Sequence, residues 1–323
     1  MASPSPKVII FGPTGAVGSA AARTAASLGA HVTLAMRDTS KAIPGIPDTS
    51  SSDRYVRIQA DLTQPATVSA AVKQSNATHA FIYLIHQSQD HMRSTIQALK
   101  DSGITLIVFL SSFTVTGKGS AALSAIPPSN VIDYLHARVE LQLEEIFTRS
   151  HFVALRPGSF ASNEFQYAPA FSSNSEVKIT YPKSRVDCIA PADIGRVGGT
   201  ILARGMPQDG NSAIYLYGPE FLKAQEVVAT IARVLGKDPK VSECDEQEAR
   251  KVMSERGYPP PLVEYFVGQT HKAEWAGDGE GEIFGRKVSE KDRGNVEKYG
   301  GGGKATTFEQ FVKENREAFG VRA

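Results

Sequence analysis

Short apolar runs alternate with amphipathic stretches through the first half of the chain. Continuous apolar runs are typical of parallel strands buried on both faces of a sheet, and apolar residues three or four apart predict helices. Five strands are expected here: Val8–Phe11, Val32–Ala35, Tyr55–Ile58, Ala80–Ile85 and Leu106–Leu110. Helices are expected between them, among others at Ser19–Leu28, Gln64–Lys73 and His91–Ser102. This alternation predicts an α/β fold built on a doubly wound parallel sheet.

The rhythm breaks after a sixth expected strand, Phe152–Leu155. Strand-like segments follow at Val177–Tyr181 and Ile214–Tyr217. Helices are expected at Ala192–Ala203, Ala224–Leu235, Glu246–Arg256, Pro261–Gln269 and Thr307–Phe319, the last with Thr307 as its N-cap. Such additions usually cover the carboxyl ends of the strands, where ligands bind in open α/β sheets. We therefore expect residues 157–323 to form a smaller, mostly C-terminal α+β substrate-binding part, interleaved with the sheet edge.

A phosphate-binding turn is predicted where the first strand ends. There the sequence runs Gly12-Pro-Thr-Gly-Ala-Val-Gly18, and small residues predict a helix after it. This order directs backbone N–H groups and the positive helix end at one point, where an anion is favoured. In dinucleotide-binding turns the three glycines permit the tight turn, the approach of the pyrophosphate and the packing of the helix. We assign these roles to Gly12, Gly15 and Gly18, and expect Thr14 and Val17 to contact the same cofactor.

The second expected strand ends in cations. Folds that bind NAD usually carry an acid here for the ribose 2′-hydroxyl, whereas an arginine accommodates a 2′-phosphate. Arg37 occupies this place and Lys41 lies just beyond, which favours NADP, while Asp38 leaves NAD open. Asp61 and Leu62 follow the third strand, where related folds contact the adenine, although Asp61 suits a helix cap equally well. Residues 1–156 are therefore expected to be an NADP-binding Rossmann domain.

Composition excludes several other classes of protein. Apolar residues make up 41% of the 323 residues, enough for a core, and a net charge of +1 gives no field that would attract nucleic acid. No apolar stretch approaches the ~20 residues of a membrane helix, so we expect no membrane contact. Cys188 and Cys244 suggest no disulfide framework and favour a reducing, cytoplasmic setting. No metal-ligand spacing and no Gly-x-Ser-x-Gly elbow occur, so we expect neither a metal site nor a hydrolase.

Further motifs follow the glycine turn in an order shared by a known family. They are Val139-Glu140, Leu155-Arg-Pro-Gly-Ser-Phe160 with Asn163, Pro191-Ala-Asp-Ile-Gly195, Gly218-Pro-Glu220 and Thr307-Phe-Glu-Gln-Phe311. With these motifs the chain resembles the NmrA-like members of the atypical short-chain dehydrogenase/reductases over nearly its whole length. The resemblance implies NADP binding. It also implies one of the family's roles: NADP-sensing regulator, quinone reductase, isoflavone-type reductase or tailoring enzyme of a fungal natural-product pathway.

The resemblance also locates the helix that carries catalysis. Short-chain dehydrogenases use Tyr-x-x-x-Lys there, and in this family the lysine stands four residues before the glutamate that Glu140 matches. This register places His136 at the lysine position and Ile132 at the tyrosine position, so the catalytic tyrosine is missing. In a second register, Tyr134 pairs with Arg138 four residues later.

The helical repeat separates these two pairs. At ~100° per residue, His136 and Glu140 flank the buried stripe of the helix on one side, and Tyr134 and Arg138 flank it on the other. Both pairs can hardly face one nicotinamide. We favour His136, which titrates near neutrality and could bind the ribose or exchange a proton, over Tyr134, and a helix-surface histidine beside Glu140 is the plain alternative.

Further candidates follow the later strands. Thr114 fits the usual place of a hydroxyl that polarises a substrate carbonyl, Ser111 is expected along the cofactor, and strand-end capping explains either of them equally well. Pro157 and Phe160 are expected beside the nicotinamide, and Asn163 is expected to order their turn. His86 and Gln87 are nicotinamide-pocket candidates or plain loop residues. The pocket should be mostly apolar, and its candidate lining, which could equally be core, is Phe113, Phe160, Phe165, Tyr167, Phe171 and Tyr265.

These features support three functions. The first is an NADPH-dependent reductase of a small, aromatic or conjugated carbonyl or quinone-type metabolite, with His136, or a water that it holds, supplying the proton. The second is a non-catalytic regulator that binds NADP and a protein partner, which the missing Tyr-x-x-x-Lys pair favours. The third is a redox-neutral isomerase, epimerase or cyclase on the same scaffold.

Overall fold

A computed structural model describes residues 5–47, 54–275, 282–283 and 286–320 of the chain. It divides into two compact units. The first comprises Met1–Pro157, Pro191–Leu216 and Asn295–Gly303, and the second comprises Gly158–Ala190, Tyr217–Gly294 and Lys304–Ala323. Both units are discontinuous in sequence, whereas the division expected after residue 156 separates two continuous stretches.

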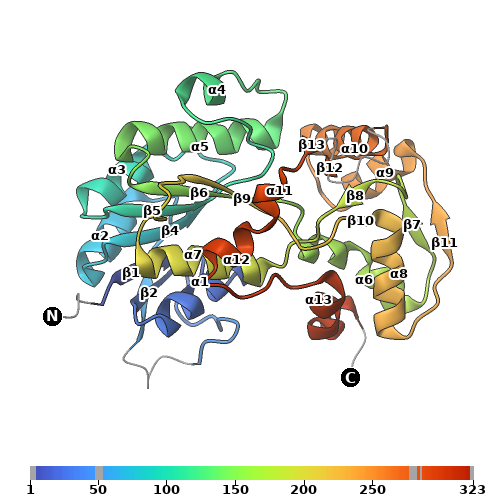
Figure 1. Cartoon of the computed structure of the whole chain (residues 1–323), viewed down its shortest axis with the longest axis horizontal. Helices are drawn as coiled ribbons and strands as arrows, with labels where there is room; N and C mark the ends of the chain where they lie inside the picture. The colour runs from blue at the N-terminus through green and yellow to red at the C-terminus, as the bar shows by residue number, and fades with distance from the viewer. Residues whose placement is uncertain (1–4, 48–53, 276–281, 284–285, 321–323) are drawn as a thin grey trace. The chain divides into compact units, whose positions relative to one another are not determined.

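The first unit is built on a parallel sheet of seven strands (Figure 1). Its strands are β1 (Lys7–Phe11), β2 (His31–Met36), β3 (Tyr55–Gln59), β4 (His79–Tyr83), β5 (Leu106–Leu110), β6 (Phe152–Pro157) and β9 (Ala213–Leu216). Their spatial order is β3-β2-β1-β4-β5-β6-β9, and every neighbouring pair is parallel. The doubly wound Rossmann fold is therefore confirmed, with all six strands expected up to residue 155. The strand expected at Ile214–Tyr217 is the seventh strand of this sheet.

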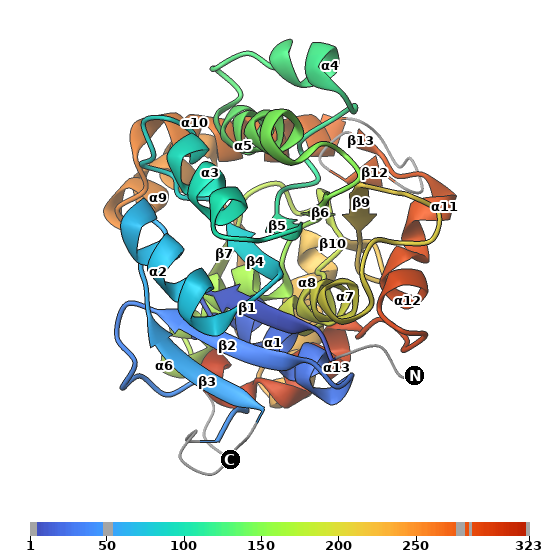
Figure 2. The same cartoon turned by 90° about the vertical axis from the view of Figure 1, so that its left-hand side faces the viewer.

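Helices cover both faces of this sheet (Figure 2). One face carries α2 (Pro65–Ser75), α3 (Arg93–Asp101) and α5 (Val131–Phe147), and the other carries α1 (Ala16–Ser27) and α7 (Pro191–Arg204). The unit also contains the short helices α4 (Ser120–Ser124) and α12 (Asn295–Tyr299). A buried apolar cluster joins the strands to α2, α3 and α5, as continuous apolar strands require.

Glycines on α7 let it pack directly against α1, the helix that begins at the glycine turn. A Cβ atom on Gly195 would lie 2.4 Å from the carbonyl oxygen of Val17, and one on Gly199 would lie 2.4 Å from that of Ala21. Real Cβ atoms do not approach backbone oxygens so closely, so both positions need glycine. Gly195 ends the Pro191-Ala-Asp-Ile-Gly195 motif, which therefore fixes α1 in place.

The second unit is a mixture of short strands and helices. Its elements are η2 (Ala161–Tyr167), α6 (Ala168–Ser173), β7 (Val177–Ile179), β8 (Arg185–Val186), β10 (Leu222–Lys223), α8 (Ala224–Leu235), β11 (Val241–Glu243), α9 (Glu246–Glu255), α10 (Pro260–Trp275), β12 (Glu282–Ile283), β13 (Arg286–Lys287), α11 (Glu290–Arg293), α13 (Phe308–Glu314) and η3 (Arg316–Phe319). The strands pair as β10-β8, β11-β7 and β12-β13. Thr307 caps α13 as expected, because its hydroxyl oxygen accepts the Gln310 N–H at 3.2 Å. Phe171, Ile231 and Phe308 lie in the core of this unit.

The packing of α1 on α7 predicts the effect of one added methyl group. We expect Gly195→Ala to reduce the free energy of unfolding by about 1–3 kcal/mol, because the new Cβ overpacks a helix contact that cannot open locally. The control is Gly268→Ala in α10, where no atom lies within 4 Å of a Cβ and alanine is the better helix former. Urea unfolding of both variants measures the difference, and equal stability would contradict this account.

Candidate functional site

The glycine turn has the backbone shape that the sequence predicts. Gly12 has a φ of +70°, in the left-handed region that favours glycine, and the Gly15 N–H donates to the Gly12 carbonyl at 3.2 Å. Helix α1 begins one residue later, and no side chain caps its N-terminus. The first N–H groups of a helix have no partner within the helix, so the exposed end of α1 offers hydrogen-bond donors to an anion.

The three glycines are needed for different reasons. A Cβ on Gly18 would lie 2.3 Å from the Gly12 oxygen, so the packing of the helix on the turn requires glycine there. A Cβ on Gly15 would lie 3.5 Å from that oxygen, an ordinary contact, and Gly15 is exposed and has an extended backbone that any residue adopts. The protein's own packing therefore does not demand Gly15. Open space at this glycine fits the approach of a pyrophosphate.

Two side chains near the turn take different positions. Thr14 is exposed at the tip of the turn, whereas Val17 is buried with 7% of its surface exposed. A side chain can reach a cofactor from Thr14, while Val17 offers a first-turn backbone N–H instead. Their expected contacts with the cofactor stay predictions.

Cations stand at the carboxyl end of β2, as the sequence predicts. Arg37 and Lys41 are both exposed, and among the described residues neither charged group makes a hydrogen bond or an ion pair. The carboxylate of Asp38, in contrast, accepts the Ser40 N–H at 3.0 Å and its hydroxyl at 2.6 Å. These hydrogen bonds lower the pKa of Asp38. Asp38, the acid that could have indicated NAD, thus stabilises its own turn. The charged groups of Arg37 and Lys41 remain available to bind an anion.

Asp61 lies after β3, and it too binds its own turn. Its carboxylate accepts the Thr63 N–H at 2.9 Å and the Thr63 hydroxyl at 2.8 Å. Asp61 therefore does not cap the following helix α2, whose N-cap is Gln64 without a side-chain hydrogen bond. Leu62 is buried, and its carbonyl accepts the Thr95 hydroxyl at 2.8 Å. An adenine contact by Asp61 or Leu62 stays a prediction.

Tyr83 lies at the same edge, although sequence reasoning did not select it. It ends β4, and a Cβ on Gly12 would lie 2.7 Å from its ring carbon Cε1, so the ring packs over the turn. The residue is 39% exposed. Partial burial raises the pKa of Tyr83, and the charges of Arg37 and Asp61 act on this pKa in opposite directions. In the sequence, the available signal was a tyrosine near the end of an otherwise apolar strand.

His136 lies on the flank of α5 that faces β5. Its ring centroid is 6.2 Å from that of Phe109. The ring nitrogen Nδ1 lies 2.8 Å from the carbonyl oxygen of Ile132, and because a carbonyl only accepts, Nδ1 carries the proton and Nε2 presents a lone pair. The pKa of His136 is lowered to about 4, mainly by burial; the hydrogen bond to Ile132 opposes this shift, and the nearby charge of His86 adds to it. The imidazole is therefore neutral at pH 7 and accepts, rather than donates, at Nε2.

Tyr134 lies on the other flank of α5. Its ring packs edge-on against His91 at 5.8 Å, and the Arg138 guanidinium lies 4.8 Å from its centroid. Both residues of the second register, Tyr134 and Arg138, are therefore in contact with each other, and Tyr134 also contacts His91. The structure thus separates the two flanks as the helical repeat predicts.

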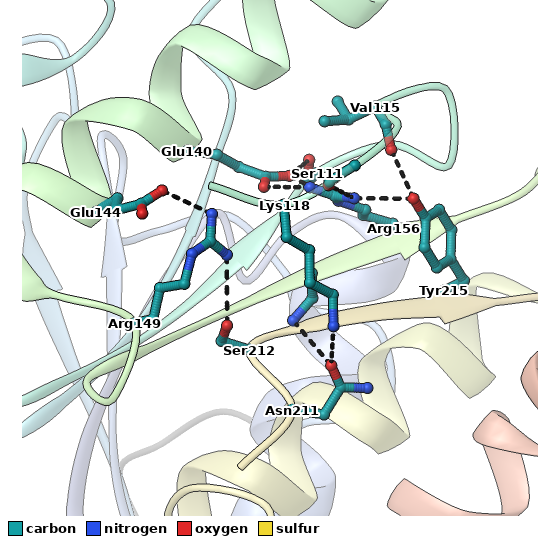
Figure 3. Close-up of polar contacts among 12 residues, drawn as sticks. Ser111, Val115, Lys118, Glu140, Glu144, Arg149, Arg156, Asn211, Ser212 and Tyr215 are labelled. Atoms are coloured by element: carbon teal, nitrogen blue, oxygen red, sulfur yellow. Dashed lines mark hydrogen bonds and ion pairs between the residues drawn. The ribbon is translucent and has the colours of Figure 1, made fainter. Parts of the chain in front are cut away.

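A buried ion pair fixes this helix against the sheet (Figure 3). Arg156 on β6 and Glu140 on α5 are both fully buried, and two guanidinium nitrogens of Arg156 donate to the carboxylate at 2.6 and 3.0 Å. The third nitrogen donates to the Gly117 carbonyl at 2.8 Å and to the Tyr215 hydroxyl at 2.9 Å. Both residues belong to motifs that carry the family resemblance. The pair therefore joins α5, β6, β9 and the loop after β5.

The same network takes up one of the candidate hydroxyls. Ser111 is buried and donates to Glu140 at 2.7 Å, so its hydroxyl is engaged inside the protein, and its expected place along the cofactor stays a prediction. The Thr114 and Ser112 hydroxyls lie 2.9 Å apart. Pro157 ends β6, and its carbonyl accepts the Phe113 N–H at 3.0 Å. Roles of Thr114 and Pro157 toward substrate or cofactor stay predictions.

Comparison with known proteins agrees with this geometry. Residues 12–190 match the NAD(P)H-binding family. A nitrogen metabolite regulation-like protein of Gibberella fujikuroi, bik4, is 35% identical over 330 residues, which cover 96% of this chain and 97% of the relative. The chain belongs to the NmrA-like group of NAD(P)H-binding proteins.

Solved structures support the same fold. An NADPH-dependent quinone oxidoreductase of Escherichia coli matches with a TM-score of 0.66 at 17% identity, covering 95% of this chain and 98% of that one. A triphenylmethane reductase of Citrobacter, solved with NADP(H), matches with a TM-score of 0.69 at 15% identity, covering 96% and 99%. At such identities these likenesses establish the fold alone.

Two features are absent from the described residues. No helix in those ranges is long and apolar enough to cross a membrane. The same residues contain no group of three or more histidine, cysteine, aspartate or glutamate side chains that could hold a metal ion.

In the second unit of this NmrA-like protein, one carboxylate links two motifs. Asp187 is buried and accepts the Ser159 N–H at 2.7 Å and the Gly218 N–H at 2.9 Å. A Cβ on Gly158 would lie 2.3 Å from this carboxylate. Burial raises the pKa of Asp187 to about 7. The segments that begin at Gly158 and Gly218 are therefore held together by one side chain.

Several expected pocket residues are part of this unit's core. Phe171 is buried, and Phe165 packs against Phe311 and Phe319 with centroids 5.7 and 4.9 Å apart. Phe160 forms a backbone bridge with Ile189. Tyr167 lies partly buried against the same core, and Tyr265 packs against Phe266. Asn163 donates to the Ser159 hydroxyl at 3.4 Å, in keeping with an ordering role.

The buried ion pair predicts a large loss of stability when its charge balance is broken. We expect Glu140→Gln to cost about 3–5 kcal/mol, because the fully buried Arg156 would keep its charge without a counter-ion. The control is Glu145→Gln, which breaks an exposed ion pair with Arg93 and should cost about 0–1 kcal/mol. Urea unfolding compares the two variants, and similar losses would show that the buried pair has no special role.

Proposed function

We propose that this protein is an NADPH-dependent reductase whose substrate is a small quinone-type or similarly conjugated carbonyl compound. The observation that carries the proposal is the state of His136, in a chain that also keeps an intact dinucleotide turn. Its Nδ1 proton is bound to the helix backbone, and its Nε2 presents a lone pair. The site is therefore equipped to hold a cofactor but has no acid at the expected position.

The residues that would hold the cofactor belong to the first unit. Backbone N–H groups at the start of α1, beside Gly12 and Gly15, would bind the pyrophosphate. Arg37 and Lys41 would bind the 2′-phosphate. NADPH, when bound, supplies a hydride. Neutral His136 would accept a hydrogen bond from a ribose hydroxyl at Nε2, which replaces the donor role of the family's lysine.

The missing acid narrows the class of substrate. Hydride addition to a simple ketone forms an alkoxide about as basic as hydroxide, which needs a positioned proton donor. Addition to a quinone forms a phenolate, whose conjugate acid has a pKa of about 10, so a proton taken from water suffices. The product is the hydroquinone, after one hydride and one proton. The fit between a site without an acid and an acceptor that needs none supports a quinone-type substrate.

A panel of acceptors tests this conclusion. We expect purified protein to oxidise NADPH with benzoquinones and naphthoquinones, and to reduce simple aliphatic ketones at least ~100-fold more slowly, because general acid catalysis contributes about that much. Absorbance of NADPH measures both rates. Equal rates on ketones and quinones would contradict the proposal, as would no rate on any quinone.

The pH dependence tests the role of His136. Its pKa of about 4 means that the neutral, accepting form persists as the pH falls below 6.5, so we expect kcat/KM for NADPH to stay level from about pH 8 to 5.5. It should fall only as the pH approaches 4 and the imidazolium forms. His136→Ala should weaken NADPH binding and leave kcat nearly unchanged. If kcat/KM instead changed with pH around 6.5, and this change disappeared in His136→Ala, His136 would be identified as a proton donor.

Cofactor choice tests the cations of the loop after β2. We expect Arg37→Gln to weaken NADPH binding about 10–100-fold, because one charge-assisted contact to the 2′-phosphate contributes about 1.5–3 kcal/mol. Binding of NADH, which lacks this phosphate, should change little. Calorimetry with both nucleotides measures the two constants. Equal losses for NADH and NADPH would remove Arg37 from phosphate recognition.

A second candidate function is an NADP-sensing regulator. The missing acid favours it, and so does the 35% identity to a nitrogen metabolite regulation-like protein. A sensor needs the cofactor site and no proton donor, and it would bind a protein partner with an affinity that NADP changes. Tight NADPH binding without hydride consumption on the whole quinone panel would support the sensor over the reductase.

A further inference from the structure

Residues 37–41, which follow β2, form the cation loop. Side chains of strand β3 bind the backbone carbonyls of three alternate residues of this loop. One guanidinium nitrogen of Arg57 donates to the Thr39 carbonyl at 2.7 Å and to the Lys41 carbonyl at 3.0 Å. The Gln59 side-chain amide donates to the Arg37 carbonyl at 3.1 Å. Three carbonyls of the loop therefore point toward β3, each two residues from the next.

The loop also stabilises itself from within. Asp38 binds the N–H and the hydroxyl of Ser40, and the Lys41 N–H donates to the Asp38 carbonyl at 3.4 Å. The carboxylate that would repel a phosphate is thus used inside the turn. The donors on β3 add a further restraint, because these exposed carbonyls would otherwise bond to water.

From this arrangement we infer that Arg57 is a positioning residue for cofactor choice, which sets the loop so that Arg37 and Lys41 can bind a 2′-phosphate. The inference rests on the proposed NADPH-dependent function. In it, Arg57 does not touch the cofactor but sets the positions of Arg37 and Lys41. Arg57 lies on β3, a strand already fixed in the sheet by its pairing with β2. A rigid strand is a suitable support for a loop whose charged side chains must meet a small dianion, because preorganised cations lose less freedom on binding.

Arg57 contributes more to this support than Gln59. Its single nitrogen bridges two carbonyls and so closes the segment from Thr39 to Lys41, whereas Gln59 reaches only the carbonyl of Arg37. A charged donor also forms stronger hydrogen bonds than a neutral amide. Loss of Arg57 should therefore release the cationic end of the loop, while the sheet pairing of β3 is retained.

The test compares Arg57→Gln with a second arginine, Arg54, one residue before the same strand. Arg54 likewise donates to a backbone carbonyl, that of Ala26 at 2.7 Å, outside the cation loop. We expect Arg57→Gln to weaken NADPH binding about tenfold, the size of one lost charge-assisted hydrogen bond, and to leave NADH binding within about twofold. Arg54→Gln should leave the ratio of the two constants unchanged. Calorimetry gives both constants, and unchanged NADH binding shows that the variant is folded.

A double-mutant cycle separates positioning from direct contact. If Arg57 acts through the loop, Arg57→Gln should weaken NADPH binding no further in a protein that already carries Arg37→Gln and Lys41→Gln, because both positioned cations are then gone. Additive losses would mean that Arg57 binds the phosphate itself and would overturn the inference. So would an unchanged NADPH/NADH ratio in Arg57→Gln.

The proposed function fails separately from this inference. Wild-type protein that binds no NADPH, or binds NADH equally well, would refute the assumed preference for NADP before any variant is made. A wild-type protein that prefers NADPH, together with an Arg57→Gln variant that prefers it equally, refutes only the role of Arg57.

Discussion

The buried pair of Arg156 and Glu140 is the interaction on which the candidate site depends. Removing two charges from water is costly, and the attraction between them offsets this cost only when the remaining polar atoms are also bonded. Here they are: Ser111 donates to the carboxylate, and Gly117 and Tyr215 accept from the guanidinium. The network specifies a single position of α5 over the ends of β5 and β6. Since His136 lies one helical turn before Glu140, its position follows from the same pair.

The fold could be predicted from sequence because the relevant signals are local. Parallel strands that are buried on both faces appear in the sequence as continuous apolar runs, and the glycine turn marks the end of the first strand and the start of the first helix. The strand at Ile214 gave the same signal, but its membership of the main sheet depends on pairing with β6, and no local pattern encodes a partner. Segments 191–216 and 295–303 join the first unit for the same reason: tertiary contacts, not composition, assign them.

The candidate site was predictable only in part. Helical geometry separated His136 from Tyr134, but not which flank faces the sheet, because that depends on the buried partner of Glu140. A hydroxyl at Ser111 looks available in sequence and is bound to Glu140 in the structure. Tyr83 and Arg57 belong to no sequence motif. Tyr83 packs on Gly12 from a neighbouring strand, and Arg57 binds backbone carbonyls of a loop distant in sequence. Contacts of this kind appear only once the strands are in register.

The same network is compatible with a neutral histidine at residue 136, where the family has a lysine. A carboxylate four residues along a helix normally stabilises a cation at the earlier position. Glu140, however, already receives two bonds from Arg156 and one from Ser111, so its charge is balanced within the core. At residue 136 burial disfavours the charged imidazole more than the attraction of Glu140 favours it. A neutral imidazole avoids this cost, since its one proton is bound by the Ile132 carbonyl and its other nitrogen can still accept a hydrogen bond. The departure from the usual catalytic pair is therefore consistent with the core beneath it, and it leaves a hydrogen-bond acceptor at Nε2 where a lysine would present a donor.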